Sequence, residues 1–128
     1  MSQTELGRLT DELNRQIQIF EDELNALELG VETSIKFEGA STRLEFNKVG
    51  KTFKLQVRDL GLKGDEVSDL RNCARETRLH AVQLFSGLFS GLLLAEDKEH
   101  GRVIKATEVV KKAIESVRTS GVCHEHLP

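Results

Sequence analysis

The first part of the chain carries apolar residues at the spacing of an amphipathic helix. The residues of this series recur every seven positions, which is typical of a narrow apolar stripe that packs against a partner helix. No proline interrupts the series, and Gly30 follows it where a helix end is expected. The pattern predicts a helix over residues 3–29. The series consists of Leu6, Leu13, Phe20 and Leu27.

Residues 31–58 change to an alternation of apolar and polar residues. Such alternation is typical of strands with one buried and one solvated face. Three alternating runs are separated by turns that contain Gly39 and Gly50, and glycine is favoured in short hairpin connections. The segment therefore predicts a three-stranded antiparallel meander, whose apolar face needs helices to cover it.

Helical spacing returns after the meander. We expect helices over residues 66–95 and 102–119, a loop over 96–101, and a tail over 120–128. Together the elements predict one α+β domain over residues 1–128, in which the long N-terminal helix precedes the meander and the two C-terminal helices pack on one face of the sheet. The apolar series of the last helix is Val103, Thr107, Val110, Ile114 and Val117.

The three predicted helices carry more apolar surface than a three-stranded sheet is able to cover. This surplus predicts a homodimer, which would bury the excess at an isologous interface. Within residues 66–95, two glycines four positions apart make a shallow groove that admits another helix, either from a second subunit or from the same monomer. The residues expected at the interface are Leu13, Phe20, Leu84, Gly87, Leu88, Gly91 and Leu92.

Composition narrows the functional classes. The 128 residues are 38% hydrophobic and 30% charged, which excludes a disordered or disulfide-stapled chain. The polar, acidic start does not resemble a secretory signal, and no apolar run approaches the ~20 residues that span a bilayer. We therefore expect a cytoplasmic protein without a membrane segment.

Charge is distributed unevenly along the chain. Residues 1–30 carry seven acidic and two basic residues, whereas residues 31–64 carry four acidic and seven basic ones, within a net charge of −3. This asymmetry indicates complementarity within or between subunits. Nucleic-acid binding is not expected, because tryptophan and tyrosine are absent and the basic segment lacks exposed stacking residues.

Three arginines form one basic stripe on the predicted helix over residues 66–95. Arg71, Arg75 and Arg78 follow helical spacing, and such a stripe is able to bind anions such as phosphate. The alternative is that the stripe pairs with Glu76 or with the acidic first helix.

Catalytic and metal-binding candidates are weak. Cys73 and His80 are seven positions apart, or roughly 10 Å on one helix, which is too far for a nucleophile and its base. Zinc favours the side chains of Cys123, His124 and His126, but structural zinc sites draw ligand pairs from separated segments. We expect no cofactor and no enzymatic activity, and we keep these three residues only as a weak metal-site candidate.

The order helix, meander, helix, together with the small size and acidic character of the chain, resembles the small bacterial secretion chaperones. The resemblance is one of architecture and rests on no shared motif, and the two helices after the meander depart from that family's usual ending. It implies a chaperone-like dimer.

We expect a non-enzymatic homodimeric interaction or adaptor module with a further protein partner. The alternative is binding of a small ligand or nucleic acid through the basic outer face of the sheet.

Overall fold

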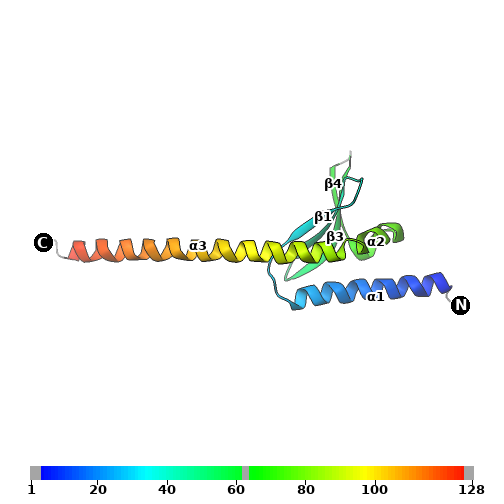
Figure 1. The fold of residues 1–128 in the computed structure, drawn as a ribbon, viewed down its shortest axis with the longest axis horizontal. Helices are drawn as coiled ribbons and strands as arrows, with labels where there is room; N and C mark the ends of the chain where they lie inside the picture. The colour runs from blue at the N-terminus through cyan, green and yellow to red at the C-terminus, as the bar shows by residue number, and fades with distance from the viewer. Residues whose placement is uncertain (1–3, 62–63, 126–128) are drawn as a thin grey trace. The chain divides into compact units, whose positions relative to one another are not determined.

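A computed structural model describes residues 4–61 and 64–125, with side chains as far as residue 121 in the last helix. The chain divides into two compact units, residues 1–96 and 97–128. Both units share the last helix, and all other elements belong to the first unit (Figure 1). In chain order the elements are α1 (Glu5–Ala26), β1 (Thr33–Lys36), β2 (Thr42–Val49), β3 (Thr52–Gly61), β4 (Gly64–Asp69), the short 3-10 helix η1 (Leu70–Asn72), α2 (Arg75–Val82) and α3 (Phe85–Glu125).

The predicted N-terminal helix is present as α1. It begins after Thr4, whose hydroxyl accepts a hydrogen bond from the Gly7 N–H at 3.0 Å and so caps the first turn. It ends at Ala26, before Gly30 and earlier than predicted. Glu28 has a φ of 52°, and this left-handed conformation turns the chain away from the helix axis.

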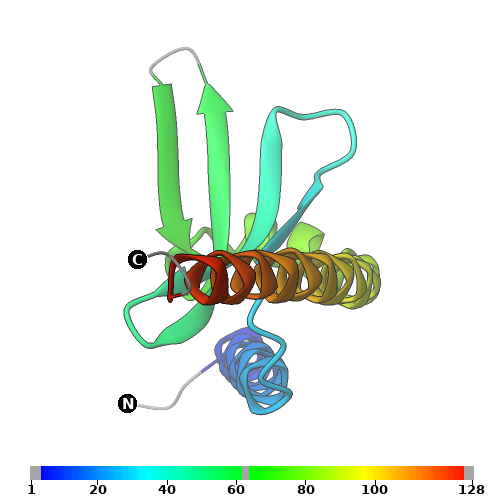
Figure 2. The ribbon, with the colours of Figure 1, turned by 90° about the vertical axis from the view of Figure 1, so that its left-hand side faces the viewer.

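The predicted meander is present, and all neighbouring strands are antiparallel in the order β1-β2-β3-β4. Its register places Leu44 opposite Val57 and Phe46 opposite Leu55, and all four side chains are buried on one face. Residues of α1, α2 and α3 pack against these side chains in one core. Figure 2 shows the strands of the sheet beside one another. The α+β class is confirmed. Apolar and polar residues alternate along the strands, as expected for a sheet with one covered and one open face.

The prediction of three strands is wrong, because β4 adds a fourth. β4 lies where the sequence predicted the start of a helix, and its six residues contain one apolar side chain, Val67. Its attachment to β3 is polar: Asp65 lies 3.5 Å from Arg58, and Asp69 lies 3.6 Å from Lys54. Apolar periodicity could not detect a strand that charge pairs and backbone hydrogen bonds hold in place.

The single helix predicted over residues 66–95 is also wrong. β4, η1 and α2 occupy its first two thirds, and α3 begins at Phe85 after a bend of 57° from α2. The apolar spacing nevertheless identified the buried side. Leu70, Ala81 and Leu88 are each 1% exposed or less, although Leu70 reaches the core from η1.

The loop predicted over residues 96–101 is part of α3, which continues without a break to Glu125. A single helical glycine costs only about 1 kcal/mol relative to alanine, so Gly101 does not end the helix. Glu99 and Arg102 form an ion pair at 2.8 Å across this stretch. The predicted helix over residues 102–119 and the first part of the predicted tail therefore belong to the same helix as Phe85.

The glycines of α3 bring this helix close to β1. A Cβ atom on Gly87 would lie 2.8 Å from Cδ1 of Ile35, and one on Gly91 would lie 3.2 Å from Oγ1 of Thr33. Both distances are shorter than ordinary contacts, so a Cβ at either position would require the side chain of Ile35 or Thr33 to shift. The small-residue groove is thus filled by β1 of the same chain.

α1 replaces a strand along part of the β3 edge. The pairing of β4 with β3 stops at Gln56 and Asp69, and the side chains of α1 bind the backbone of β3 beyond that point. Asn25 accepts a hydrogen bond from the Phe53 N–H at 2.9 Å and donates one to the Phe53 carbonyl at 2.8 Å. One turn earlier, Glu21 accepts from the Leu55 N–H. These contacts satisfy backbone groups that would otherwise cost folding energy.

We predict that Asn25→Ala destabilises the protein by about 1–3 kcal/mol, because it leaves the N–H and the carbonyl of Phe53 without these two hydrogen bonds. Chemical denaturation measures the change. Gln16→Ala is the matched control: Gln16 lies on the same helix and donates to Glu12 in an exposed hydrogen bond, so its effect should stay within about 0.5 kcal/mol. Equal effects of the two substitutions would contradict the role given to Asn25.

Glu21 provides a pH-dependent prediction. Burial raises the pKa of Glu21 above its usual value of 4.5, against the hydrogen bond from Leu55 and the charge of Arg71. The folded state therefore holds this proton more tightly than the unfolded state, and ionisation of Glu21 lowers stability as the pH rises through its folded-state pKa. Glu21→Gln should raise the unfolding free energy at pH 7, and the gain should shrink toward pH 4. Exposed Glu23→Gln is the control, and the same pH profile for both variants would contradict the interpretation.

Candidate functional site

The predicted interface residues of the first unit are largely used inside that unit. Leu88 and Leu92 have no exposed surface, and Leu84 lines a shallow pocket beside Phe37. Leu13 packs partly buried against the core. The groove of Gly87 and Gly91 holds β1 of the same chain. Of the two uses that the sequence left open, contact with a second subunit or packing within the monomer, the structure shows packing within the monomer.

Phe20, the remaining predicted interface residue, stacks on Phe85. The ring centroids are 4.3 Å apart and the rings are 13° from parallel. This pair joins α1 to the first turn of α3, so the seven-residue series of α1 serves in part to bind this unit's own last helix.

The apolar series of the second unit is exposed instead. Six branched aliphatic side chains of α3 keep between 43% and 72% of their surface accessible: Val103, Ile104, Val109, Val110, Ile114 and Val117. Scattered exposed apolar residues are normal on a protein surface, but a continuous stripe of them marks an interaction site. We call the series Val103, Thr107, Val110, Ile114 and Val117 the α3 seam.

The α3 seam has heptad spacing, with alternating steps of four and three residues. Val103, Val110 and Val117 take one core position of the heptad, and Thr107 and Ile114 take the other. Eight residues between 103 and 119 are β-branched, and such residues weaken an isolated helix. In proteins, most helical stability comes from burial of an apolar face rather than from intrinsic propensity, and here that face is exposed.

The arginine stripe bonds to α1. Arg71 donates to Gln18, Arg75 to Thr10 at 3.4 Å, and Arg78 to Asn14. The three acceptors are four residues apart on α1 and therefore lie along one face. The three arginines thus form a polar ladder between α1 and the η1–α2 segment.

The hydrogen-bond acceptors in this ladder are neutral side chains of α1, the acidic helix that the sequence offered as a partner, and the charge of Arg71 also acts on Glu21 of that helix. Arg78 also keeps a buried Nε without a hydrogen-bond partner among the described residues. Anion binding by these arginines stays a prediction, and their placement first of all supports a structural role.

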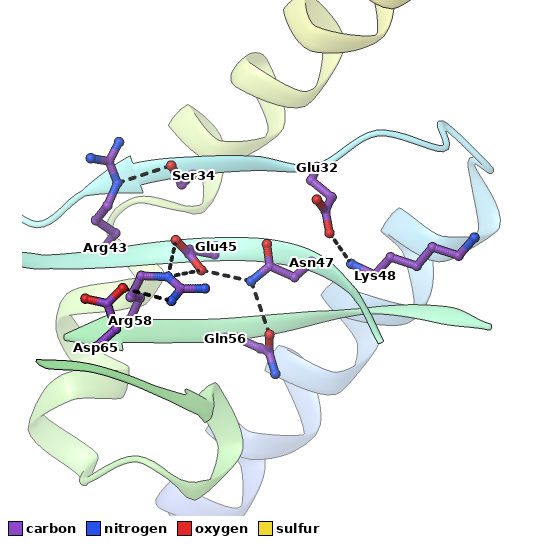
Figure 3. Close-up of polar contacts among 9 residues, drawn as sticks. All are labelled: Glu32, Ser34, Arg43, Glu45, Asn47, Lys48, Gln56, Arg58 and Asp65. Atoms are coloured by element: carbon purple, nitrogen blue, oxygen red, sulfur yellow. Dashed lines mark hydrogen bonds and ion pairs between the residues drawn. The ribbon is translucent and has the colours of Figure 1, made fainter. Parts of the chain in front are cut away.

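The open face of the sheet carries a connected polar network (Figure 3). At its centre, Arg58 Nε lies 3.0 Å from both carboxylate oxygens of Glu45, which is only 8% exposed. Asn47 donates to Glu45 at 2.9 Å and to Gln56 at 3.1 Å. The hydrogen bond with Glu45 raises the pKa of Arg58 above its usual value. Asp65 lies on the other side of the same guanidinium at 3.5 Å.

Three basic side chains of the sheet are thereby engaged by neighbouring residues. Arg58 binds two carboxylates, Lys54 lies beside Asp69, and Arg43 donates to the Ser34 hydroxyl at 3.2 Å. Carboxylates that already bind these cations reduce the positive potential available to an anionic ligand. This arrangement gives less support to nucleic-acid binding through the open face than the count of basic residues alone suggested.

Cys73 and His80 do not share a helix. Cys73 lies between η1 and α2, and its thiol donates to the Asp69 carbonyl at 3.5 Å, while His80 pairs with Glu76 at 3.1 Å on the exposed side of α2. Burial raises the pKa of the Cys73 thiol, although Arg78 acts in the opposite direction. A protonated thiol is a poor nucleophile.

The weak metal-site candidates lie outside the side chains that the structure describes. His126 lies outside the described residues, and the described side chains end before Cys123 and His124. Among the residues that are described, no group of three histidine, cysteine or acidic side chains is placed to hold a metal ion.

Within residues 4–61 and 64–125, no single helix is both long enough and apolar enough to cross a membrane. α2 and the part of α3 from Phe85 to Gly121 reach the required length and hydropathy only when they are counted together, across the 57° bend.

Sequence reasoning missed the residues that fasten α1 to the sheet and the buried acid of the open face. Glu21, Asn25 and Glu45 are polar residues beside apolar ones in the sequence, and only the pairing of distant segments gives them their partners. The position of Glu45 between Leu44 and Phe46 predicts that it lies on the open face, but it does not predict the contact with Arg58.

Comparison of the chain with protein-family models, with curated proteins and with solved structures finds no match. The candidate site therefore rests on geometry and chemistry, and the α3 seam is an exposed apolar series with regular heptad spacing.

Proposed function

We propose that this protein is a non-enzymatic interaction module that pairs with a second copy of itself through the α3 seam. The observation that carries the proposal is the exposure of the seam's branched aliphatic side chains on a continuous helix. Burying one such side chain is worth about 1.5–3 kcal/mol, so a stripe of them provides a substantial driving force for association.

Pairing through α3 also suits an adaptor or chaperone-like role. It leaves the first unit of each copy with its own core and its own sheet, because that unit already fills its helix groove and covers its apolar sheet face. Two identical units in one assembly provide two identical binding surfaces, and a partner that engages both gains effective concentration. The further protein partner is part of this proposal.

Binding of a small ligand or nucleic acid through the open sheet face is the alternative function. It has weaker support, because Glu45, Asp65 and Asp69 already pair with two of the basic side chains of that face. No geometric feature of the face favours an added ligand over the existing polar network.

Val110→Asp tests the proposed function, because it places a charge in the middle of the α3 seam. In sedimentation equilibrium the wild-type protein should show about twice the chain mass of 14.3 kDa. The variant should dissociate at least roughly 100-fold more readily, since burying an unpaired carboxylate costs several kcal/mol.

Val109→Asp is the matched control, since it makes the same substitution at the next position, about 100° around the helix. Val109 is also exposed, at 66%, but it lies outside the series of the seam. This variant should keep most of the wild-type association. A wild-type mass of one chain at all concentrations, or equal effects of both substitutions, would contradict pairing through the seam.

A further inference from the structure

The heptad positions around the α3 seam carry information about the direction of the second copy. In heptad notation, Val103, Val110 and Val117 are d residues, and Thr107 and Ile114 are a residues. The face opposite the seam, position f, carries Lys98, Lys105 and Lys112. The helix is therefore apolar at the seam and basic behind it, which is the arrangement of a two-stranded pair rather than of a helix buried all round.

We propose that α3 of the second copy lies antiparallel to α3 of the first. The two-fold axis that relates the two helices crosses each of them between Glu108 and Val109. This inference rests on the proposed function and specifies its geometry. In an antiparallel pair, each a residue faces a d residue of the other helix. Val103 then meets the partner's Ile114, Thr107 meets the partner's Val110, and the two-fold axis repeats both contacts.

The positions flanking the seam favour this register. On one side, Asp97 lies opposite the partner's Arg118, and Ile104 lies opposite the aliphatic stem of the partner's Lys111. The two-fold axis repeats each pair, so the assembly has two opposite-charge contacts at its ends. All four residues belong to the second unit and are exposed, which leaves them accessible for such contacts.

The other side of the seam is lined by small residues. Ala106 lies opposite the partner's Ala113, and Glu99 lies opposite the partner's Ser120. Alanine at facing positions lets two helices approach closely, and it introduces no charge that needs a partner. Antiparallel packing thus pairs charges on one flank and small side chains on the other.

A parallel, in-register pair of helices makes less favourable contacts between the same flanking residues. Its flanking contacts join Glu99 to the partner's Ile104, Ala106 to Lys111, and Ala113 to Arg118, so no acid meets a base. Valine fills every d position, whereas leucine at d is typical of parallel dimers. The second unit begins with two acids and one base at residues 97–99 and carries three basic residues and one acid over 111–118. Only the antiparallel pair brings these two segments together.

Distances between identical spin labels distinguish the two directions. Cys73→Ser and Cys123→Ser remove the native thiols, and Lys98→Cys or Lys112→Cys then places one nitroxide on position f, away from the seam. With a rise of 1.5 Å per residue, the antiparallel pair separates the two labels along the helix axis by roughly 30 Å at position 98 and roughly 10 Å at position 112. A parallel pair gives no axial separation at either position.

Pulsed dipolar spectroscopy on the full chain measures both distances, with the mass checked by sedimentation in the same buffer. The proposal expects the distance at position 98 to exceed that at position 112 by roughly 10 Å or more. Equal distances in a particle of dimer mass overturn the antiparallel direction and leave the pairing intact. A dimer without dipolar coupling shows contact through another surface, such as α1, and overturns both the antiparallel direction and pairing through the α3 seam. A particle of monomer mass overturns the proposed function itself.

Discussion

The unpaired edge of β3 is the constraint on which the first unit depends. β4 is too short to cover this edge, and an unpaired backbone donor or acceptor in a packed interior is costly. Asn25 and Glu21 of α1 bind the backbone where β4 has ended. This attachment fixes the direction of α1 along the sheet, and it thereby directs Ile17 and Leu24 of the same helix into the core.

With α1 in place, the first unit uses part of its helical surface internally. The arginine ladder joins α1 to α2, Phe20 stacks on Phe85, and the glycines of α3 accept β1. Some of the apolar helix surface that the sequence indicates stays exposed on α1, at Leu6, Leu9, Ile19 and Leu27. A second exposed series lies in the second unit, on the α3 seam, and its regular heptad spacing makes the seam the centre of the functional proposal.

The sequence predicted those elements whose apolar period is regular. The alternation in β2 and β3 identified both strands and their buried side, because burial of one face imposes that period. The series of α1 identified the helix, but its outer members Leu6 and Leu27 are exposed, and the buried apolar residues of α1 are Ile17 and Leu24. The apolar period did not predict β4, because the side-chain contacts of this strand with β3 are between charged residues. The interface was expected around Leu88, yet this residue belongs to the core, since periodicity reveals which side of a helix is apolar and not what covers it. The seam itself was visible as spacing, and only its exposure separates it from a packed face.

Hydrogen exchange of the backbone amides of residues 103–117, measured over a range of protein concentrations, tests the central claim that a second copy covers the α3 seam. The account predicts slow exchange that becomes slower as the concentration rises, because association stabilises a helix that is marginal alone. Fast exchange at every concentration, or protection that does not depend on concentration in a monomeric protein, would contradict it.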